Sequence, residues 1–187
     1  MTPRILFLGP AGSPLLPRLE GEVLRREDPI ALDDVEAARP DIVVAHGYRH
    51  IIPADVIAAL PGRVVNLHIS LLPHNRGADP NLWSWVDDTP KGVTIHHVDE
   101  HLDTGDIIAQ REVAFTGSET LAETYEALQA AVVDLFVETW PAIRDGTAPR
   151  TPQPPGGSYH RTSDRRRVEH LLTRGWDTPV RALRPSA

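Results

Sequence analysis

The sequence predicts an α/β fold built on a mostly parallel central sheet. Two short apolar runs, Arg4–Gly9 and Asp41–His46, have the composition of buried strands. A helical stretch from Pro53 to Leu60 then leads directly into a third strand, Arg63–Ser70. Strand–helix–strand units of this length give parallel strands joined by right-handed crossovers. A length of 187 residues with 41% hydrophobic residues suits one sizeable core, so residues 1–187 are expected to form a single domain.

Weaker elements lie between the first two strands. Ser13–Glu20 is expected to form a short helix, which Pro14 and Pro17 restrict to its first turns. Glu22–Arg25 is a weak strand, and Leu32–Arg39 forms one or two helical turns that stop before a proline. The glycines after the first strand do not form G-x-G-x-x-G, and no phosphate-binding G-x-x-x-x-G-K-[ST] motif is present. These absences point away from dinucleotide and ATP chemistry.

The second half predicts two more strands and a long helix. Pro80–Asp87 is a short helix, Gly92–His97 is a strand, and Ile107–Ala114 is a further strand that is expected to be antiparallel. Thr120 and Glu123 have the spacing of a capping box and open a helix that should lie across the sheet and end between residues 141 and 146. Its expected apolar stripe consists of Leu121, Tyr125, Leu128, Val132, Leu135 and Trp140. Residues 150–187 form a Pro/Gly-rich and then basic extension.

Polar residues suited to chemistry are concentrated in Arg63–Asp106. Asn66, His68 and Ser70 alternate with apolar residues, so a strand would project all three from one face. The later loop Asp99–Asp106 carries four carboxylates in eight positions. In open α/β sheets, ligands bind beyond the carboxyl ends of the strands. The sequence therefore predicts a site where an amide, an imidazole and a hydroxyl meet an acidic loop.

These two motifs resemble the catalytic core of the folate-dependent formyltransferases, the family that includes glycinamide ribonucleotide, methionyl-tRNA and sugar N-formyltransferases. The family carries an N-x-H-x-S-L-L-P strand and a later D-E-x-x-D-x-G-D-like loop, which stand nearly intact at Asn66–Pro73 and Asp99–Asp106. The resemblance runs from about residue 41 to about residue 112 and more loosely to both ends. Over Asp87–Asp106 it is closest to peptide-synthetase formylation domains and sugar formyltransferases. Ile69 departs from the proline usual in the family, and we expect this to alter strand packing rather than chemistry.

The resemblance implies a Rossmann-like three-layer formyltransferase fold, 10-formyltetrahydrofolate as cosubstrate, and Asn66, His68 and Asp103 as catalytic residues. Formyl transfer to an amine passes through a tetrahedral intermediate with negative charge on the formyl oxygen. Asn66 can donate an amide N–H to that oxygen, and His68 can donate to it or shuttle a proton. Asp103 can orient the imidazole and accept the proton of the amine. Without these partners, His68 would be interpreted as a structural histidine on a strand.

Further residues are expected to bind the two substrates by the same resemblance. The segment after Asp41–His46 matches the one that holds the pterin in the family, largely through main-chain groups. The expected folate-binding residues are Tyr48, His50, Ile51, Ile52, Asp99, Glu100, His101 and Leu102, and the expected acceptor-binding residues are Ser70, Arg76, Gly77 and Asp79. Ser70 should shape the turn by hydrogen bonding, because no G-x-S-x-G motif makes it a nucleophile. Trp83 and Trp85 follow this strand and serve either recognition or plain packing.

Several other classes of protein are disfavoured. The chain has no Cys, which excludes disulfides, thiolate ligands and a Cys nucleophile. The acidic loop lacks EF-hand spacing, and His96 and His97 must face opposite sides of a strand, so no metal is expected. A net charge of −7 argues against a dedicated nucleic-acid binder. No secretory segment or membrane span is evident, so a soluble cytoplasmic protein is expected.

The acceptor is expected to be a primary amine of a small metabolite, either an amino sugar nucleotide or an amino acid held on a carrier protein. The short segment before Asn66 disfavours the purine acceptor, and the lack of a barrel domain after the core disfavours methionyl-tRNA. A hydrolase that gives the formyl group to water, and a folate-binding module without turnover, remain alternatives. The arginines within residues 161–167 are either a solvated face or a contact for phosphate or a carrier protein. A homodimer is left open.

Overall fold

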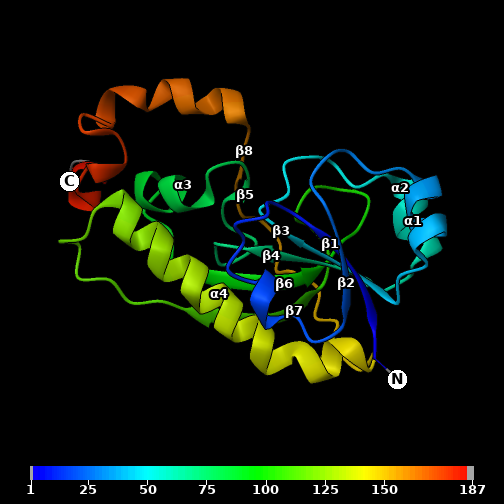
Figure 1. Cartoon of the computed structure of the whole chain (residues 1–187). Helices are drawn as coiled ribbons and strands as arrows, with labels where there is room; N and C mark the ends of the chain where they lie inside the picture. Colours follow the sequence, from blue (N-terminus) through cyan, green and yellow to red (C-terminus); the bar gives the residue numbers. More distant parts are fainter. Residues whose placement is uncertain (1, 185–187) are drawn as a thin grey trace.

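A computed structural model of the chain, which describes residues 2–184, contains a six-stranded sheet between two helical layers (Figure 1). The strand order is β2-β1-β3-β4-β6-β7. The strands are β1 (Arg4–Leu8), β2 (Glu22–Arg26), β3 (Ile42–His46), β4 (Val64–His68), β6 (Gly92–His97) and β7 (Ile107–Glu112). The first four pair in parallel, whereas β6 is antiparallel to both β4 and β7. The three-layer, mostly parallel α/β fold is therefore confirmed.

The described residues form four α-helices, and the longest has a clear local cause in the sequence. They are α1 (Leu32–Ala38), α2 (Ala54–Ala59), α3 (Pro80–Val86) and α4 (Leu121–Arg144). The capping box predicted for α4 is present, because Thr120 Oγ1 accepts from Glu123 N at 3.2 Å and Glu123 Oε2 accepts from Thr120 N at 2.7 Å. α4 packs on one face of the sheet, and α1 with α2 covers the other (Figure 1). No helix within residues 2–184 is both long and apolar enough to cross a bilayer.

The alternation expected in the central strand is confirmed in the core. Val65, Leu67 and Ile69 are buried in the cluster under α4, so Asn66 and His68 project from the opposite face of the sheet. The predicted stripe of α4 is also buried, except that Tyr125 is 39% exposed. Phe136, which the predicted stripe lacks, is fully buried beside the others.

Three details differ from the expectation. Ser13–Glu20 contains only a three-residue 3₁₀ turn, Leu16–Arg18, because its prolines prevent a continued helix. The central strand ends at His68, two residues earlier than expected. The expected antiparallel strand Ile107–Ala114 is β7, which opposes its neighbour β6, but β6 is the strand that runs against the other five.

The last part of the chain packs back onto the domain. A second, two-stranded parallel sheet joins β5 (Arg76–Gly77) to β8 (Tyr159–His160). Four 3₁₀ turns follow at Thr162–Arg167, Glu169–Leu171, Gly175–Asp177 and Val180–Ala182. Val168, Val180 and Leu183 are buried in one cluster with Leu82, Trp83, Trp85 and Leu121. This segment therefore covers α3 and the start of α4, as the orange and red trace in Figure 1 shows.

Candidate active site

A cavity of about 630 Å³ opens beyond the carboxyl ends of β3 and β4, where ligands bind in open α/β sheets. Its walls come from the segment after β3, the end of β4, the start of α3, the acidic loop after β6, and α4 with the C-terminal turns. Asn66, His68 and Asp103 all line it. The described residues contain no group of three or more His, Asp or Glu side chains placed to hold a metal ion.

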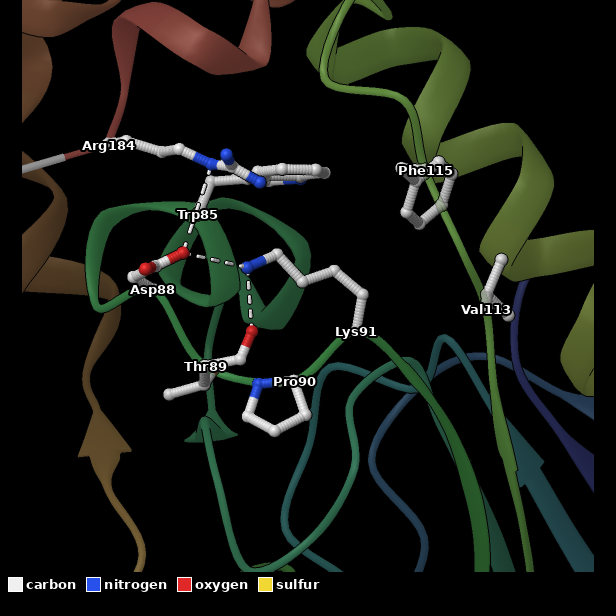
Figure 2. Close-up of a pocket in the computed structure, with 8 residues that line it drawn as sticks. All are labelled: Trp85, Asp88, Thr89, Pro90, Lys91, Val113, Phe115 and Arg184. Carbon is white, nitrogen blue, oxygen red and sulfur yellow. Dashed lines mark hydrogen bonds and ion pairs between the residues drawn. The ribbon is translucent and has the colours of Figure 1, made fainter.

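A second cavity of about 290 Å³ lies elsewhere and shares no lining residue with the first (Figure 2). Lys91 Nζ donates to Thr89 O at 2.6 Å, lies 3.5 Å from Asp88 Oδ1 and sits 4.5 Å from the centre of the Trp85 ring. Arg184 stacks over the same ring and faces Asp88. The charged side chains of this cavity therefore pair with one another around the buried Trp85, and we assign the cavity a structural role.

The Asp103 carboxylate is the centre of the larger site. Its Oδ1 accepts from Asn66 Nδ2 at 3.2 Å and lies 3.5 Å from His96 Nε2. Its Oδ2 accepts from Gly77 N at 2.8 Å and lies 3.6 Å from His68 Nδ1. Asp103 is only 8% exposed, so these groups replace water around the charge. The structure thus brings the three predicted catalytic residues together, with Asn66 and His68 both facing the Asp103 carboxylate.

In the neutral form of each imidazole, a hydrogen bond to a carbonyl group fixes which ring nitrogen carries the proton. A carbonyl oxygen can only accept, so His68 Nε2 donates to Asn75 O at 2.9 Å and leaves Nδ1 facing Asp103. His96 Nδ1 donates to His97 O at 2.8 Å, so its Nε2 accepts from Asn66 Nδ2 at 3.2 Å. A second proton on either ring would lie on the nitrogen that faces the Asp103 carboxylate.

The surroundings hold Asp103 in its ionised form. Burial alone would raise the pKa of Asp103, because a charge is costly to desolvate. Positive charge on His68, hydrogen bonding and charge at His96, and the Gly77 N–H together outweigh burial and bring the pKa well below its usual range. The site therefore presents a carboxylate, rather than a carboxylic acid, to the two imidazoles at neutral pH.

Close backbone contacts fix the acidic loop. Asp103 has a left-handed φ of 55°, a conformation that Asp tolerates better than most residues. At Gly105, a Cβ atom would lie 1.8 Å from His97 O, so only glycine lets the loop approach β6 this closely. Asp99 Oδ1 accepts from His101 N at 3.1 Å and from Thr104 Oγ1 at 2.7 Å. These contacts aim Asp103 back into the cavity.

All the residues expected to bind folate line the cavity. The Tyr48 hydroxyl donates to Asp28 O at 2.9 Å and accepts from Ile30 N, while its ring packs edge-on against His50. Ile51 is 80% exposed and Leu102 is 47% exposed, so apolar surface faces the mouth of the cavity from both loops. Such surface suits a flat aromatic ligand, but the roles of these residues stay predictions.

The residues expected to bind the acceptor are not all in the cavity. Gly77 and Asp79 line it, whereas Ser70 and Arg76 do not. Ser70 Oγ donates to His74 O at 2.6 Å, as expected for a residue that shapes the turn. The Arg76 guanidinium donates instead to Gln153 Oε1, at 2.7 Å from Nη2 and 3.2 Å from Nε.

The two tryptophans lie in the protein interior. Trp83 stacks on His160 with ring centres 3.9 Å apart, and Trp85 is 1% exposed. Neither lines the large cavity, so packing accounts for both.

The motifs missed several residues that the fold brings into the cavity. His96 lies directly opposite Asn66 in the β4–β6 register, which places the two side chains on one face as neighbours. The alternation of residues in β6 predicts which face His96 occupies, but its contact with Asn66 follows only once β6 is known to pair with β4. His46 Nε2 donates to Gln129 Oε1 at 2.7 Å, and Ser13 Oγ donates to His46 Nδ1 at 2.8 Å. Tyr125 and Trp176 pack edge to face at the rim.

Among solved structures, the chain is similar to the formyltransferase PseJ from Anoxybacillus kamchatkensis, in complex with UDP-4,6-dideoxy-4-formamido-L-AltNAc and tetrahydrofolate. The two are 48% identical, each is 96% covered, and the TM-score is 0.91. A 4-N formyltransferase from Francisella tularensis shares the fold at 22% identity and a TM-score of 0.75, with 96% of this chain and 85% of that chain covered.

Among curated proteins, the chain is 36% identical over 145 residues to methionyl-tRNA formyltransferase of Pelotomaculum thermopropionicum and 39% identical over 121 residues to that of Bordetella petrii. These matches cover 77% and 64% of this chain, but it spans less than half the length of either relative, 45% and 38%. The sequence model described as "Formyl transferase" matches residues 19–140, a range that contains β3, β4, the acidic loop and most of α4. The motifs, the three-layer fold and this match agree, and the chain belongs to the formyl transferase family.

Proposed function

We propose that this protein transfers the formyl group of 10-formyltetrahydrofolate to a primary amine on a nucleotide-linked amino sugar. The single observation that carries this proposal is the cluster of Asn66, His68 and Asp103 in one cavity of a family member. The acceptor class is supported by the 48% identity, across 96% of both chains, to a formyltransferase in complex with a UDP-sugar and tetrahydrofolate. The methionyl-tRNA enzymes are matched over less than half their length and support this acceptor less.

The cavity suits two substrates that meet at the carboxylate. Its volume of about 630 Å³ lies within the usual range for ligand sites. The segment after β3 and the acidic loop supply the wall with exposed Ile51 and Leu102, which suits a pterin. The start of α3, α4 and the C-terminal turns supply other parts of the lining, which suit the acceptor. We propose that the substrates bind against these different parts of the lining, with the formyl carbon beside Asn66 and His68.

In this arrangement, the side chains would stabilise charge and move one proton. The amine nitrogen bonds to the formyl carbon, and the bond from that carbon to N10 of the folate breaks. Asn66 makes two hydrogen bonds of 3.2 Å, at the long end of the range, and one N–H can turn to the formyl oxygen as charge develops there. The proton lost by the amine passes to Asp103 or to His68 Nδ1 and then to departing N10. When the proton is on His68 Nδ1, the Asp103 carboxylate compensates the charge of the imidazolium.

The finer expectations remain part of the proposal. We propose that residues 1–187 act as one catalytic domain in the cytoplasm. Gly77 and Asp79 would contact the acceptor. A carrier-bound aminoacyl acceptor and a homodimer stay predictions.

The test is formyl transfer in vitro, read by product mass, with amino sugar nucleotides and aminoacyl carrier proteins as acceptors. The mass of an amino sugar nucleotide should increase by about 28 Da, the mass of the added CO, and only when 10-formyltetrahydrofolate is present. His68→Ala should lower kcat by about 10²-fold or more and leave folate binding largely intact. His170→Ala is the control, because His170 is exposed and outside the cavity. Formate release that is independent of any amine would instead identify a hydrolase.

A further inference from the structure

The segment that follows α4 and ends with β8, here called the strap (residues 149–160), crosses over the acidic loop. Thr151 exchanges two backbone hydrogen bonds with Ile107, at 2.8 and 3.0 Å. At the far end of the strap, Tyr159 and His160 pair with Arg76 and Gly77 in the β5–β8 sheet. The strap is therefore tied to the start of β7, which directly follows the acidic loop, and to β5, whose Gly77 N–H contacts the Asp103 carboxylate. It lies outside the residues matched by the family model.

Gln153 lies in the middle of the strap and binds the acidic loop directly. Its Nε2 donates to Asp103 O at 2.8 Å and to Gly105 O at 2.9 Å. Its Oε1 accepts two hydrogen bonds from the Arg76 guanidinium. Because a guanidinium only donates, Arg76 fixes which end of the amide faces the loop. Both N–H groups of Gln153 are consequently aimed at carbonyls of the loop.

These contacts complete a three-sided support of Asp103. Gly77 N holds the carboxylate, and Gly105 is pressed against His97 O, where no side chain would fit. Gln153 holds the carbonyls on either side of Thr104. A residue at φ 55° has no regular ladder to hold its backbone, so its direction depends on such side-chain bonds. Loss of the Gln153 bonds would let the loop, and with it the carboxylate, move relative to His68.

We propose that Gln153, oriented by Arg76, is a positioning residue that holds the Asp103 carboxylate against Asn66 and His68. The inference rests on the proposed function for its kinetic consequence, but its structural consequence can be measured without turnover. Gln153 touches no reacting atom in this proposal. Arg76 takes the same supporting role, and the acceptor contact expected for it from the sequence stays a prediction.

The first variant is Gln153→Met, which keeps the length and most of the volume of the side chain but removes the hydrogen bonds. We expect kcat for formyl transfer to fall by about 10- to 100-fold, because a displacement of about 1 Å of a catalytic group has effects of this size. KM for both substrates should change by no more than about threefold, since neither substrate contacts Gln153. Amide exchange measured by NMR should show faster exchange at Gly77 N, whose acceptor is Asp103.

Arg150→Ala is the matched control on the same strap. Arg150 pairs with Asp106 Oδ2 at 3.2 Å, so it contacts the acidic loop without contacting Asp103 or Gly105. Its guanidinium is half exposed, and exposed pairs contribute little. We expect wild-type kcat and wild-type exchange at Gly77 N in this variant.

Arg76→Lys tests the orienting role, because lysine keeps the charge but cannot donate the paired bonds. Combined with Gln153→Met, it should lower kcat no further than Gln153→Met alone, since both changes release the same bonds. Additive losses, or a Gln153→Met protein with unchanged kcat and unchanged exchange at Gly77 N, would overturn the inference. If the wild-type protein shows no formyl transfer, the proposed function fails, and the exchange at Gly77 N still decides whether Gln153 positions Asp103.

Discussion

At the scale of single residues, the site depends on the negative charge of Asp103, which persists although burial favours the neutral acid. Asp103 is held by one amide, one backbone N–H and two imidazoles. A buried carboxylate with fewer partners would be protonated or would pull the loop toward water. Its neighbours depend on it in turn, because Asn66 Nδ2 would lose an acceptor and a protonated His68 would lose its counter-charge.

Asp103→Asn removes this charge with little change of shape. We expect kcat for formyl transfer to fall by about 10²- to 10⁴-fold, because the amide can neither accept the proton nor compensate a charged imidazole. Steady-state kinetics, with binding of tetrahydrofolate measured by fluorescence, would check this. Asp106→Asn is the matched control, since that carboxylate pairs with Arg150 on the surface. An Asp103→Asn protein that keeps kcat within about twofold of wild type would contradict the role given to Asp103.

His46 gives the fold a predictable response to acid. Burial lowers the pKa of His46 below the value of 6.5, and the hydrogen bond to Gln129 offsets only part of this. As the pH falls below 6.5, the unfolded chain takes up a proton at this position before the folded one does. The unfolded state then binds more protons, so the free energy of unfolding decreases with falling pH. Urea unfolding at pH 5, 6 and 7.5 should show this loss, and His46→Gln should make it smaller, whereas a variant of the exposed His170 should not.

At this scale, the sequence predicted the residues whose positions follow from local patterns and short spacings. Period-two alternation placed Asn66 and His68 on one face, and the structure confirms that arrangement. His96 was missed because its neighbourhood depends on the strand pairing, which no single segment encodes. The expected acceptor contact of Arg76 came from the family resemblance and stays a prediction. Its hydrogen bond to Gln153 was missed, because the two residues lie 77 positions apart in the chain. Contacts of that kind follow from packing rather than from motifs.

At the scale of elements, the acidic loop is the part that has least room to change. Gly105→Ala would place a methyl group 1.8 Å from His97 O, so the loop or β6 must move. We expect the free energy of unfolding to fall by about 1–3 kcal/mol. We also expect a loss of kcat of about tenfold or more, because Asp103 moves with the loop. Urea denaturation and steady-state kinetics would measure both, with Gly12→Ala as the control because a Cβ there meets nothing within 4 Å.

The helices and longer strands were largely predictable from the sequence, whereas the short strands and the packing between elements were less predictable. The capping box of α4 and the buried runs of β1 and β3 have local causes, and they appear where the sequence places them. The short β5 and β8 have no such pattern, because two residues in each carry no periodicity. Tyr125 fits the helical period of α4 yet lies at the cavity rim, where it packs edge to face against Trp176.

At the scale of the whole molecule, the C-terminal turns both cover the core and complete the cavity. Thr162 and Trp176 line the cavity, while Val180 is fully buried beside α3. Val180→Asp would bury a charge without a partner, so we expect this segment to detach. Limited proteolysis should then cut within residues 161–180. KM for the acceptor should rise by more than the affinity for folate changes. Thr173→Asp places the same charge at an exposed position of this segment and should behave as wild type.

If Gln153 positions Asp103 as proposed, the place of the strap in the sequence also affects when the site forms during synthesis. The ribosome releases β1 through α4 before the strap, and domains begin to fold as their chain emerges. Until Gln153 has left the exit tunnel, the sheet can be assembled while Asp103 still lacks the partner that aims it. The chain would therefore acquire its catalytic geometry late, after most of its hydrophobic core is in place.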